Sequence, residues 1–161
     1  MSDFVLGPAF ATLLTRELER LVRQVEAYPD EADLWRTPGS VTNSAGTLAL
    51  HLAGNLEHFV GGALGGSGHL RDRDGEFGDR DVPRGEIIRC IRIRACRTNV
   101  RRALEARSDA TLLTAYPGQA PASLGEGVTA ATFLTHLTWH LGWHLGQIDD
   151  HRRAVAGGNP V

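Results

Sequence analysis

The stretch that decides the fold is residues 135–148, which read Thr135-His136-Leu137-Thr138-Trp139-His140-Leu141-Gly142-Trp143-His144-Leu145-Gly146-Gln147-Ile148. Its three histidines recur every four residues, so on a helix their side chains stack one turn above another along a single face. Most of the remaining circumference is apolar, which predicts a helix that is buried nearly all round. Buried imidazoles need partners. Two histidines at i and i+4 can bind one ion, so the pattern predicts a metal site.

The composition is that of one globular domain spanning residues 1–161. Hydrophobic residues make up 42% of the chain and charged residues 22%, with a formal net charge of -2. This charge gives no global attraction for nucleic acid, and no apolar run approaches the roughly 20 residues of a membrane span. We therefore expect neither nucleic acid nor membrane as a partner. The N-terminus lacks an export signature, and Cys90 and Cys96 lie on different faces of one predicted helix, so we expect a reducing cytoplasm.

Helical periodicity predicts four long helices and no β-structure. The fold class is therefore all-α, a four-helix bundle, and bundle sites are built in the core from side chains on facing helices. Residues 69–81 and 108–127 are predicted to be loops between helices. The predicted helices run from Phe10 to Ala27, from a cap at Ser44 to about Leu64, from Pro83 to Arg107, and from a cap at Thr129 to Gly157.

The second predicted helix offers the third metal ligand. His51 lies near its middle. His58 is displaced from it by about 10 Å along the axis, too far to share an ion. We therefore predict that His51, His140 and His144 bind the metal. His136 lies roughly 12 Å from His144 along the axis, so it is predicted either to support the ligands from behind or to line the pocket.

Two further polar residues are candidates for the pocket. Gln147 either orients His144 or packs between helices beside Gly146, and Asn55 either faces the pocket or makes a structural hydrogen bond. Several other residues are assigned to the surface or to structural roles. The surface or an interface is predicted for His58, His69 and His151, and a salt-bridged structural or dimer loop for Arg71, Arg73 and Glu76. A solvated helix face is predicted for Arg94, Arg97 and Arg101. The core or its rim is predicted for Trp35, Trp139 and Trp143.

Three segments resemble the DinB/YfiT-like superfamily, and within it the DUF1572/DUF664-like branch. They are residues 43–56 with His51-Leu52-Ala53-Gly54-Asn55-Leu56, residues 71–77 with Arg71-Asp72-Arg73-Asp74-Gly75-Glu76-Phe77, and residues 136–147 with the three spaced histidines and Gly146-Gln147. The resemblance implies an up-up-down-down bundle, often a homodimer. It also implies one divalent metal, zinc or nickel, on His51, His140 and His144.

The resemblance further implies a chemistry. Some members of the superfamily look like thiol-dependent S-transferases that use bacillithiol, mycothiol or glutathione. Three protein ligands leave open positions on a metal, as in catalytic sites. The sequence shows no acidic base beside the histidines and places no cysteine at the metal, which favours an external small-molecule thiol and an electrophile as partners. A non-catalytic metal-binding stress-response dimer and a metal-dependent hydrolase remain alternatives, and no catalytic residue is assigned.

Overall fold

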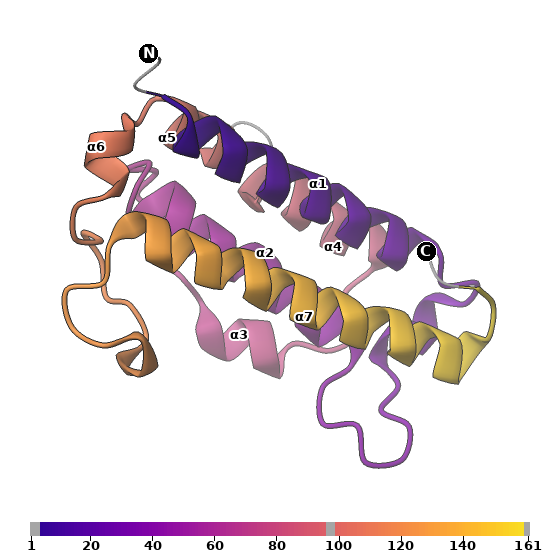
Figure 1. The fold of residues 1–161 in the computed structure, drawn as a ribbon. Helices are drawn as coiled ribbons and strands as arrows, with labels where there is room; N and C mark the ends of the chain where they lie inside the picture. The colour runs from indigo at the N-terminus through magenta and orange to yellow at the C-terminus, as the bar shows by residue number, and fades with distance from the viewer. Residues whose placement is uncertain (1–3, 96–98, 160–161) are drawn as a thin grey trace.

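The structure is a computed structural model that describes residues 4–95 and 99–159, and its long helices pack side by side in a bundle (Figure 1). The π-helical segments η2 (Glu57–Gly62) and η3 (Ile91–Ala95) continue α2 and α4. No strand occurs in the described ranges, so the predicted all-α fold is confirmed. The bundle consists of α1 (Leu6–Glu26), α2 (Ala45–Leu56), α4 (Arg84–Cys90) with α5 (Asn99–Glu105), and α7 (Ala130–Ala156).

The direction of the helices differs from the expected order. Tyr28, just after α1, contacts His151 near the end of α7, so α1 and α7 run parallel. Gly7, at the start of α1, lies against the carbonyl of Leu104 at the end of α5, so these two helices are antiparallel. Figure 1 shows that α2 runs the same way as α4 and α5. The order is therefore up-down-down-up, and the up-up-down-down expectation is wrong, because the connection after α1 turns back at the same end of the bundle.

Side-chain caps fix where the helices that carry the histidines begin. Ser44 caps α2, with its Oγ accepting a hydrogen bond from the backbone N–H of Thr47. Thr129 caps α7 by accepting from the N–H of Thr132. Such caps satisfy backbone donors that lack a partner in the first helical turn. Both capping positions agree with the sequence prediction. The helix α7 ends at Gly157, whose φ of 73° suits glycine.

Only one side of α7 is buried, which corrects the prediction of a helix buried all round. Leu134, Leu137, Leu141, Leu145 and Ile148 have relative exposures of 0–2% and face the core. Their spacing of three and four residues gives a continuous stripe. The two tryptophans of α7 are four residues apart on another face and are more than half exposed. Apolar composition therefore overstated the burial of α7, because it does not distinguish core from surface tryptophans.

Three further predictions need correction. The charged stretch 69–81 contains the short helix α3 (Arg73–Gly78), capped by Asp72, because the Asp72 carboxylate accepts from the N–H of Gly75. Residues 108–127 contain α6 (Asp109–Leu112) and η4 (Ala122–Leu124). His151 is buried rather than superficial, since its Nδ1 lies 2.7 Å from the Tyr28 hydroxyl and its Nε2 lies 2.7 Å from the Arg36 carbonyl oxygen.

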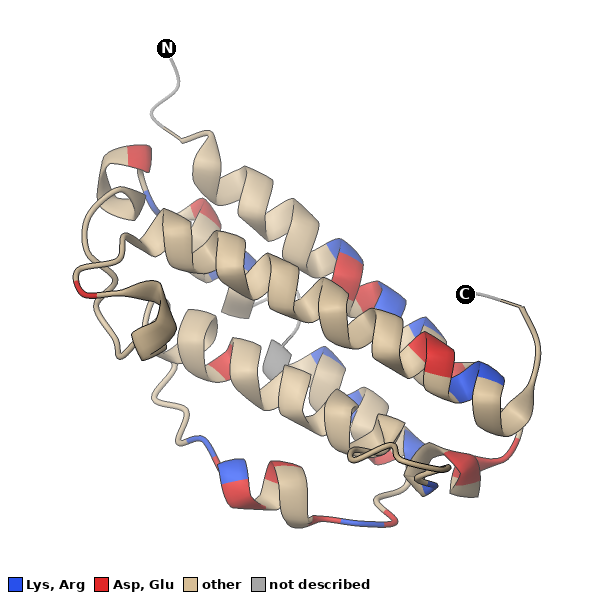
Figure 2. Cartoon of the chain, turned by 60° about the horizontal axis from the view of Figure 1, so that its bottom comes forward, with Lys and Arg blue, Asp and Glu red and all other residues tan. Residues whose placement is uncertain are grey.

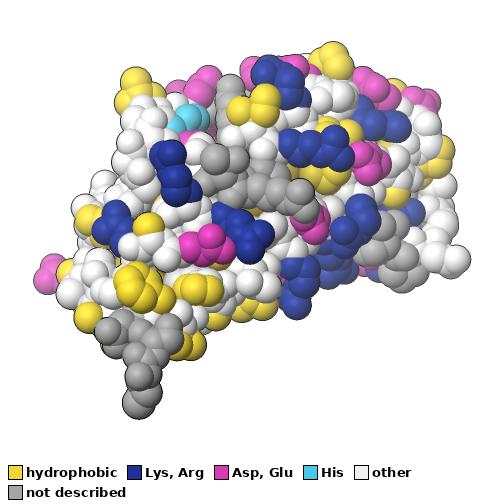
Figure 3. Space-filling model, turned by 90° about the horizontal axis from the view of Figure 1, so that it is seen from above, with side chains coloured by type: hydrophobic (Ala, Val, Ile, Leu, Met, Phe, Trp, Pro, Cys, Tyr) yellow, Lys and Arg dark blue, Asp and Glu magenta, His cyan; other side chains and the backbone are white. Residues whose placement is uncertain are grey.

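The surface shows mixed charge. Basic and acidic residues alternate on α3 and on the C-terminal halves of α1 and α7 (Figure 2), and both signs mix with hydrophobic side chains on the face seen from above α1 (Figure 3). Arg101 is exposed and pairs with Glu105, as a solvated helix face requires. The side chain of Arg94, together with Arg97 and Cys96, lies outside the described residues. Within the described ranges no helix is both long and apolar enough to span a bilayer.

Candidate metal centre

The three predicted ligands converge from two antiparallel helices. His51 comes from α2, and His140 and His144 come from successive turns of α7. Their ring centroids are 5.3 Å apart for His51 and His140, 5.5 Å for His51 and His144, and 4.5 Å for His140 and His144. His51 is buried, and the other two are half-buried. The i, i+4 spacing therefore brings both α7 imidazoles to the same neighbour on α2.

The same nitrogen of each ring points at the common centre. The Nε2 of His140 lies 3.4 Å from the Nε2 of His51 and 3.1 Å from that of His144, and one ligand atom from each residue falls within a 4.8 Å cluster. A tetrahedral zinc ion about 2.0–2.1 Å from each nitrogen sets the nitrogens about 3.3 Å apart. The spacing of the Nε2 atoms therefore fits one shared ion.

An acidic residue from α3 fixes the ring of His51. The Glu76 Oε2 lies 3.2 Å from the Nδ1 of His51, and the same carboxylate accepts hydrogen bonds from Arg71 Nε at 2.8 Å and Nη2 at 2.7 Å. Arg71 Nη2 also lies 3.2 Å from the His51 Nδ1. Since Arg71 can only donate, the carboxylate is the acceptor for the Nδ1 proton, which leaves the Nε2 lone pair free for a metal.

Sequence reasoning missed this role of Glu76. It identified no acidic residue beside the histidines and assigned the charged segment a structural role. The available signal was a glycine on α2: a Cβ added to Gly54 would lie 2.0 Å from Glu76 Oε1. Only a residue without a side chain at this position lets α3 approach α2 closely enough for the carboxylate to reach His51.

Gln147 plays the equivalent part for His144. Its Oε1 lies 2.7 Å from the Nδ1 of His144. Because an amide oxygen can only accept, this contact favours the tautomer with the proton on Nδ1, in which the Nε2 that faces the shared centre is unprotonated. Of the two roles considered for Gln147, the contact favours orientation of the ligand. With His51 and His144 both presenting lone pairs, one proton on His140 could satisfy only one of them, so a cation is the partner that suits all three.

Burial and mutual repulsion disfavour the charged forms of the two α7 histidines. Burial, followed by the neighbouring His144 and His51, lowers the pKa of His140 to about 3. Burial also lowers the pKa of His144, although the hydrogen bond with Gln147 opposes it. Burial would raise the pKa of Glu76, but the hydrogen bonds from Arg71 and His51 outweigh it and hold this pKa below its ordinary value. At neutral pH His140 and His144 are therefore uncharged, and the supporting carboxylate is charged.

The histidines open into a cavity of about 420 Å³. His136 lines this cavity rather than joining the cluster; its ring centroid lies 6.2 Å from that of His140. Asn55 lines it as well, is 6% exposed, and has an Oδ1 without a hydrogen-bond partner among the described residues. The remaining wall is mostly apolar or basic and is formed by Leu48, Phe59, Phe77, Phe133, Leu137 and Pro121 with Asn43, Arg71 and Arg73.

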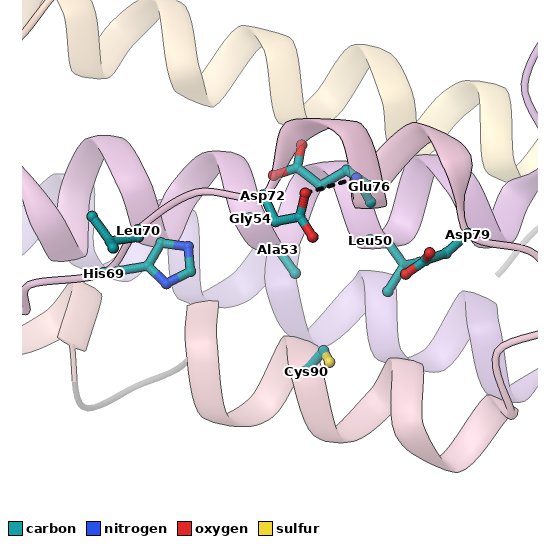
Figure 4. A pocket seen from close by; sticks show the side chains of 10 residues that line it. Leu50, Ala53, Gly54, His69, Leu70, Asp72, Glu76, Asp79 and Cys90 are labelled. Atoms are coloured by element: carbon teal, nitrogen blue, oxygen red, sulfur yellow. Dashed lines mark hydrogen bonds between the residues drawn. The ribbon is translucent and has the colours of Figure 1, made fainter.

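A second cavity, of about 330 Å³, adjoins the supporting carboxylate. Glu76 lines it together with Asp72, His69 and Cys90 (Figure 4). Figure 4 shows His69 and Cys90 in separate parts of the cavity. In the part of the chain that the structure describes, only the three histidines of the first cavity form a group with metal-ligand spacing.

A helical bundle whose core-facing histidines converge from two helices defines a class of helical metal-binding proteins. The chain belongs to the DinB superfamily, because the model of that family matches residues 13–148. The match extends from α1 to the end of the histidine-bearing turns of α7. No curated protein and no solved structure matches the chain. Family membership and the histidine cluster together fit a protein that binds a metal ion.

Proposed function

We propose that this protein is a metal-dependent, thiol-using S-transferase-like enzyme. In this proposal a divalent ion, zinc or nickel, binds His51, His140 and His144, and bacillithiol, mycothiol or glutathione is the thiol. The observation that carries the proposal is the convergence of three Nε2 atoms at the wall of an open cavity. Three protein nitrogens leave a tetrahedral ion with a free position, as catalytic ions have and structural ions lack.

The residues around the site favour an external nucleophile. Cys90, the one cysteine among the described residues, lines the other cavity. A divalent ion held by His51, His140 and His144 would favour the thiolate form of an incoming thiol. Attack of that sulfur on an electrophilic carbon would form an S–C bond while the leaving group departs with its electron pair. His136 lines the cavity without a hydrogen bond to any described residue and can accept the thiol proton.

The hydrolase alternative lacks a free carboxylate base. Both oxygens of Glu76 accept hydrogen bonds from Arg71, and its pKa is lowered, so this group positions His51 rather than taking a proton from water. A screen of esters, amides and phosphoesters at neutral and alkaline pH tests the hydrolase. The third candidate, a non-catalytic metal-binding stress-response dimer, predicts an occupied site without turnover of any of these substrates.

Metal content and thiol spectroscopy test the proposal directly. Protein purified without a tag is expected to contain equimolar metal, and His144→Ala to contain none. His58→Ala is the matched control, since His58 does not line the cavity. Cobalt-loaded protein is expected to develop a sulfur-to-cobalt absorption band with one of the three thiols. Metal-free wild-type protein that also fails to take up added ions, or cobalt-loaded protein that is silent with all three thiols, would overturn the proposal.

We further propose that the protein is a homodimer in the cytoplasm, where small-molecule thiols stay reduced. The exposed face of α7 supports a second copy as the partner. Trp139 and Trp143 are 60% and 57% exposed, and their rings stack with centroids 5.9 Å apart. Gly142 and Gly146 lie between and beyond them with open space around their Cα atoms. Exposed tryptophans beside small residues allow another helix to approach closely.

A further inference from the structure

We infer that the molecule bound in the histidine cavity carries a carboxylate, and that Arg73 binds it. This inference rests on the proposed function and adds the chemical class of its small-molecule substrate. It begins from two polar side chains of the cavity wall, Arg73 and Asn55, that the metal site itself does not use.

Arg73 is held beside the metal site by an aromatic ring. Its Cζ lies 5.0 Å from the centroid of the Phe77 ring, and the same ring lies 4.9 Å from the centroid of the His51 imidazole. One aromatic side chain therefore separates the guanidinium from a metal ligand. Contact with an aromatic face restrains a guanidinium without neutralising its charge, so the exposed Arg73 brings a positive charge to the edge of the cavity.

Arg73 has no ion-pair partner in the part of the chain that the structure describes. The neighbouring Arg71 is paired with Glu76, whereas Arg73 forms no ion pair with any residue in the described ranges, and none of the residues lining the cavity is acidic. A planar guanidinium matches a carboxylate with two parallel hydrogen bonds. One guanidinium balances a single negative charge, which suits a carboxylate better than a phosphate dianion.

Asn55 gives an independent indication that the cavity binds a polar molecule. Asn55 lies one helical turn after His51, and only 6% of its surface is exposed. Its side-chain oxygen Oδ1 has no hydrogen-bond partner among the described residues. Buried polar atoms in folded proteins are almost always paired. A molecule that has an N–H or O–H group as well as a carboxylate supplies both missing partners, as an amino-acid-derived thiol does.

A pair of small thiols of equal length tests the inference on cobalt-loaded, full-length protein. 3-Mercaptopropionate carries the carboxylate, and 3-mercaptopropionamide replaces it with a neutral amide. Titration of the sulfur-to-cobalt band gives a dissociation constant for each. We expect the wild-type protein to bind the carboxylate about tenfold more tightly, Arg73→Gln to lose this preference, and Arg73→Lys to retain part of it because it keeps the charge but not the planar fork.

Arg80→Gln is the matched control. Arg80 is an exposed arginine near α3 that donates to the backbone carbonyls of Phe77 and Asp79 and does not line the cavity. This variant is expected to keep the full preference for the carboxylate. Equal affinity of the wild-type protein for the two thiols, or an undiminished preference in Arg73→Gln, would overturn the assignment of Arg73.

A second pair of probes separates this inference from the thiol proposal. Imidazole-4-acetate and 4-methylimidazole reach an ion through a ring nitrogen, and their binding is followed through the visible bands of cobalt. If no thiol binds but imidazole-4-acetate is preferred in an Arg73-dependent way, the thiol proposal fails and the carboxylate site stands. If thiols bind and neither carboxylate probe is preferred, the carboxylate inference fails alone.

Discussion

Replacing Glu76 by Gln tests whether this carboxylate fixes the metal-binding form of His51. The two Glu76 oxygens accept from Arg71 at 2.7 and 2.8 Å, and one of them lies 3.2 Å from His51 Nδ1. A glutamine amide has one oxygen and one NH₂ group, and the NH₂ group can only donate. If the oxygen takes the place of Oε2, the NH₂ group faces the Arg71 Nε–H, donor against donor; if the oxygen takes the place of Oε1, the NH₂ group faces His51 Nδ1. If its NH₂ faces Nδ1, the imidazole proton moves to Nε2 and blocks the metal.

The magnitude follows from the contact that is lost. A hydrogen bond to a charged group contributes roughly 1.5–3 kcal/mol, which corresponds to about ten- to a hundredfold in dissociation constant. Zinc affinity is measured by competition with a chromophoric chelator at neutral pH. Asp74→Asn, which changes an exposed acid on the same helix α3, is expected to keep the wild-type affinity. A folded Glu76→Gln protein with wild-type zinc affinity would refute the proposed role of Glu76.

Three further predictions concern space, pH and assembly. Gly54→Ala places a Cβ 2.0 Å from Glu76 Oε1, so zinc affinity should fall about tenfold in the same competition assay. Gly85→Ala, where the added Cβ meets open space, should leave zinc affinity unchanged. Equal losses of affinity in the two variants would contradict the steric argument. Folding lowers the pKa of His140 from its ordinary 6.5 to about 3, so between these pH values the unfolded chain binds a proton that the folded metal-free protein does not. Stability to urea should therefore be constant above about pH 6.5 and decline towards pH 3, and His140→Leu should flatten this decline. Identical pH profiles for the two proteins would disprove the role of His140. Trp143→Glu should convert a dimer to a monomer in light scattering without loss of helical circular dichroism, and an unchanged mass would exclude this face as the interface.

The sequence was most informative where one helix carries the whole pattern. The relation between His140 and His144 is set by helical periodicity alone, and the structure places both rings at one centre. His51 could be chosen over His58 because rise per residue separates the two along α2. The fold class followed from the same periodicity, since four amphipathic stretches without β-alternation have few other ways to bury their apolar faces.

The features of the fold and site that the sequence did not predict depend on contacts between segments, which periodicity does not encode. Glu76 is 25 residues from His51, and its local sequence reads as a solvated charged loop. Its position depends on α3 folding back over Gly54. In the same way, Trp139 was predicted in the core or at its rim, because hydrophobicity does not report which face of α7 packs against another helix. The direction of the helices followed from where the connection after α1 leads, which no local pattern determines.

His51 is supported from behind by α3, which is not one of the long helices. Because Glu76 contacts the ring from that short segment, binding of an ion to the histidines would be thermodynamically linked to the docking of α3. The bound ion would stabilise the docked segment, and undocking of α3 would weaken ion binding. Arg73 begins the same segment. If Arg73 binds the carboxylate of a substrate, as inferred above, the bound molecule holds α3 against α2. Substrate binding and ion binding would then stabilise each other through the six residues of α3.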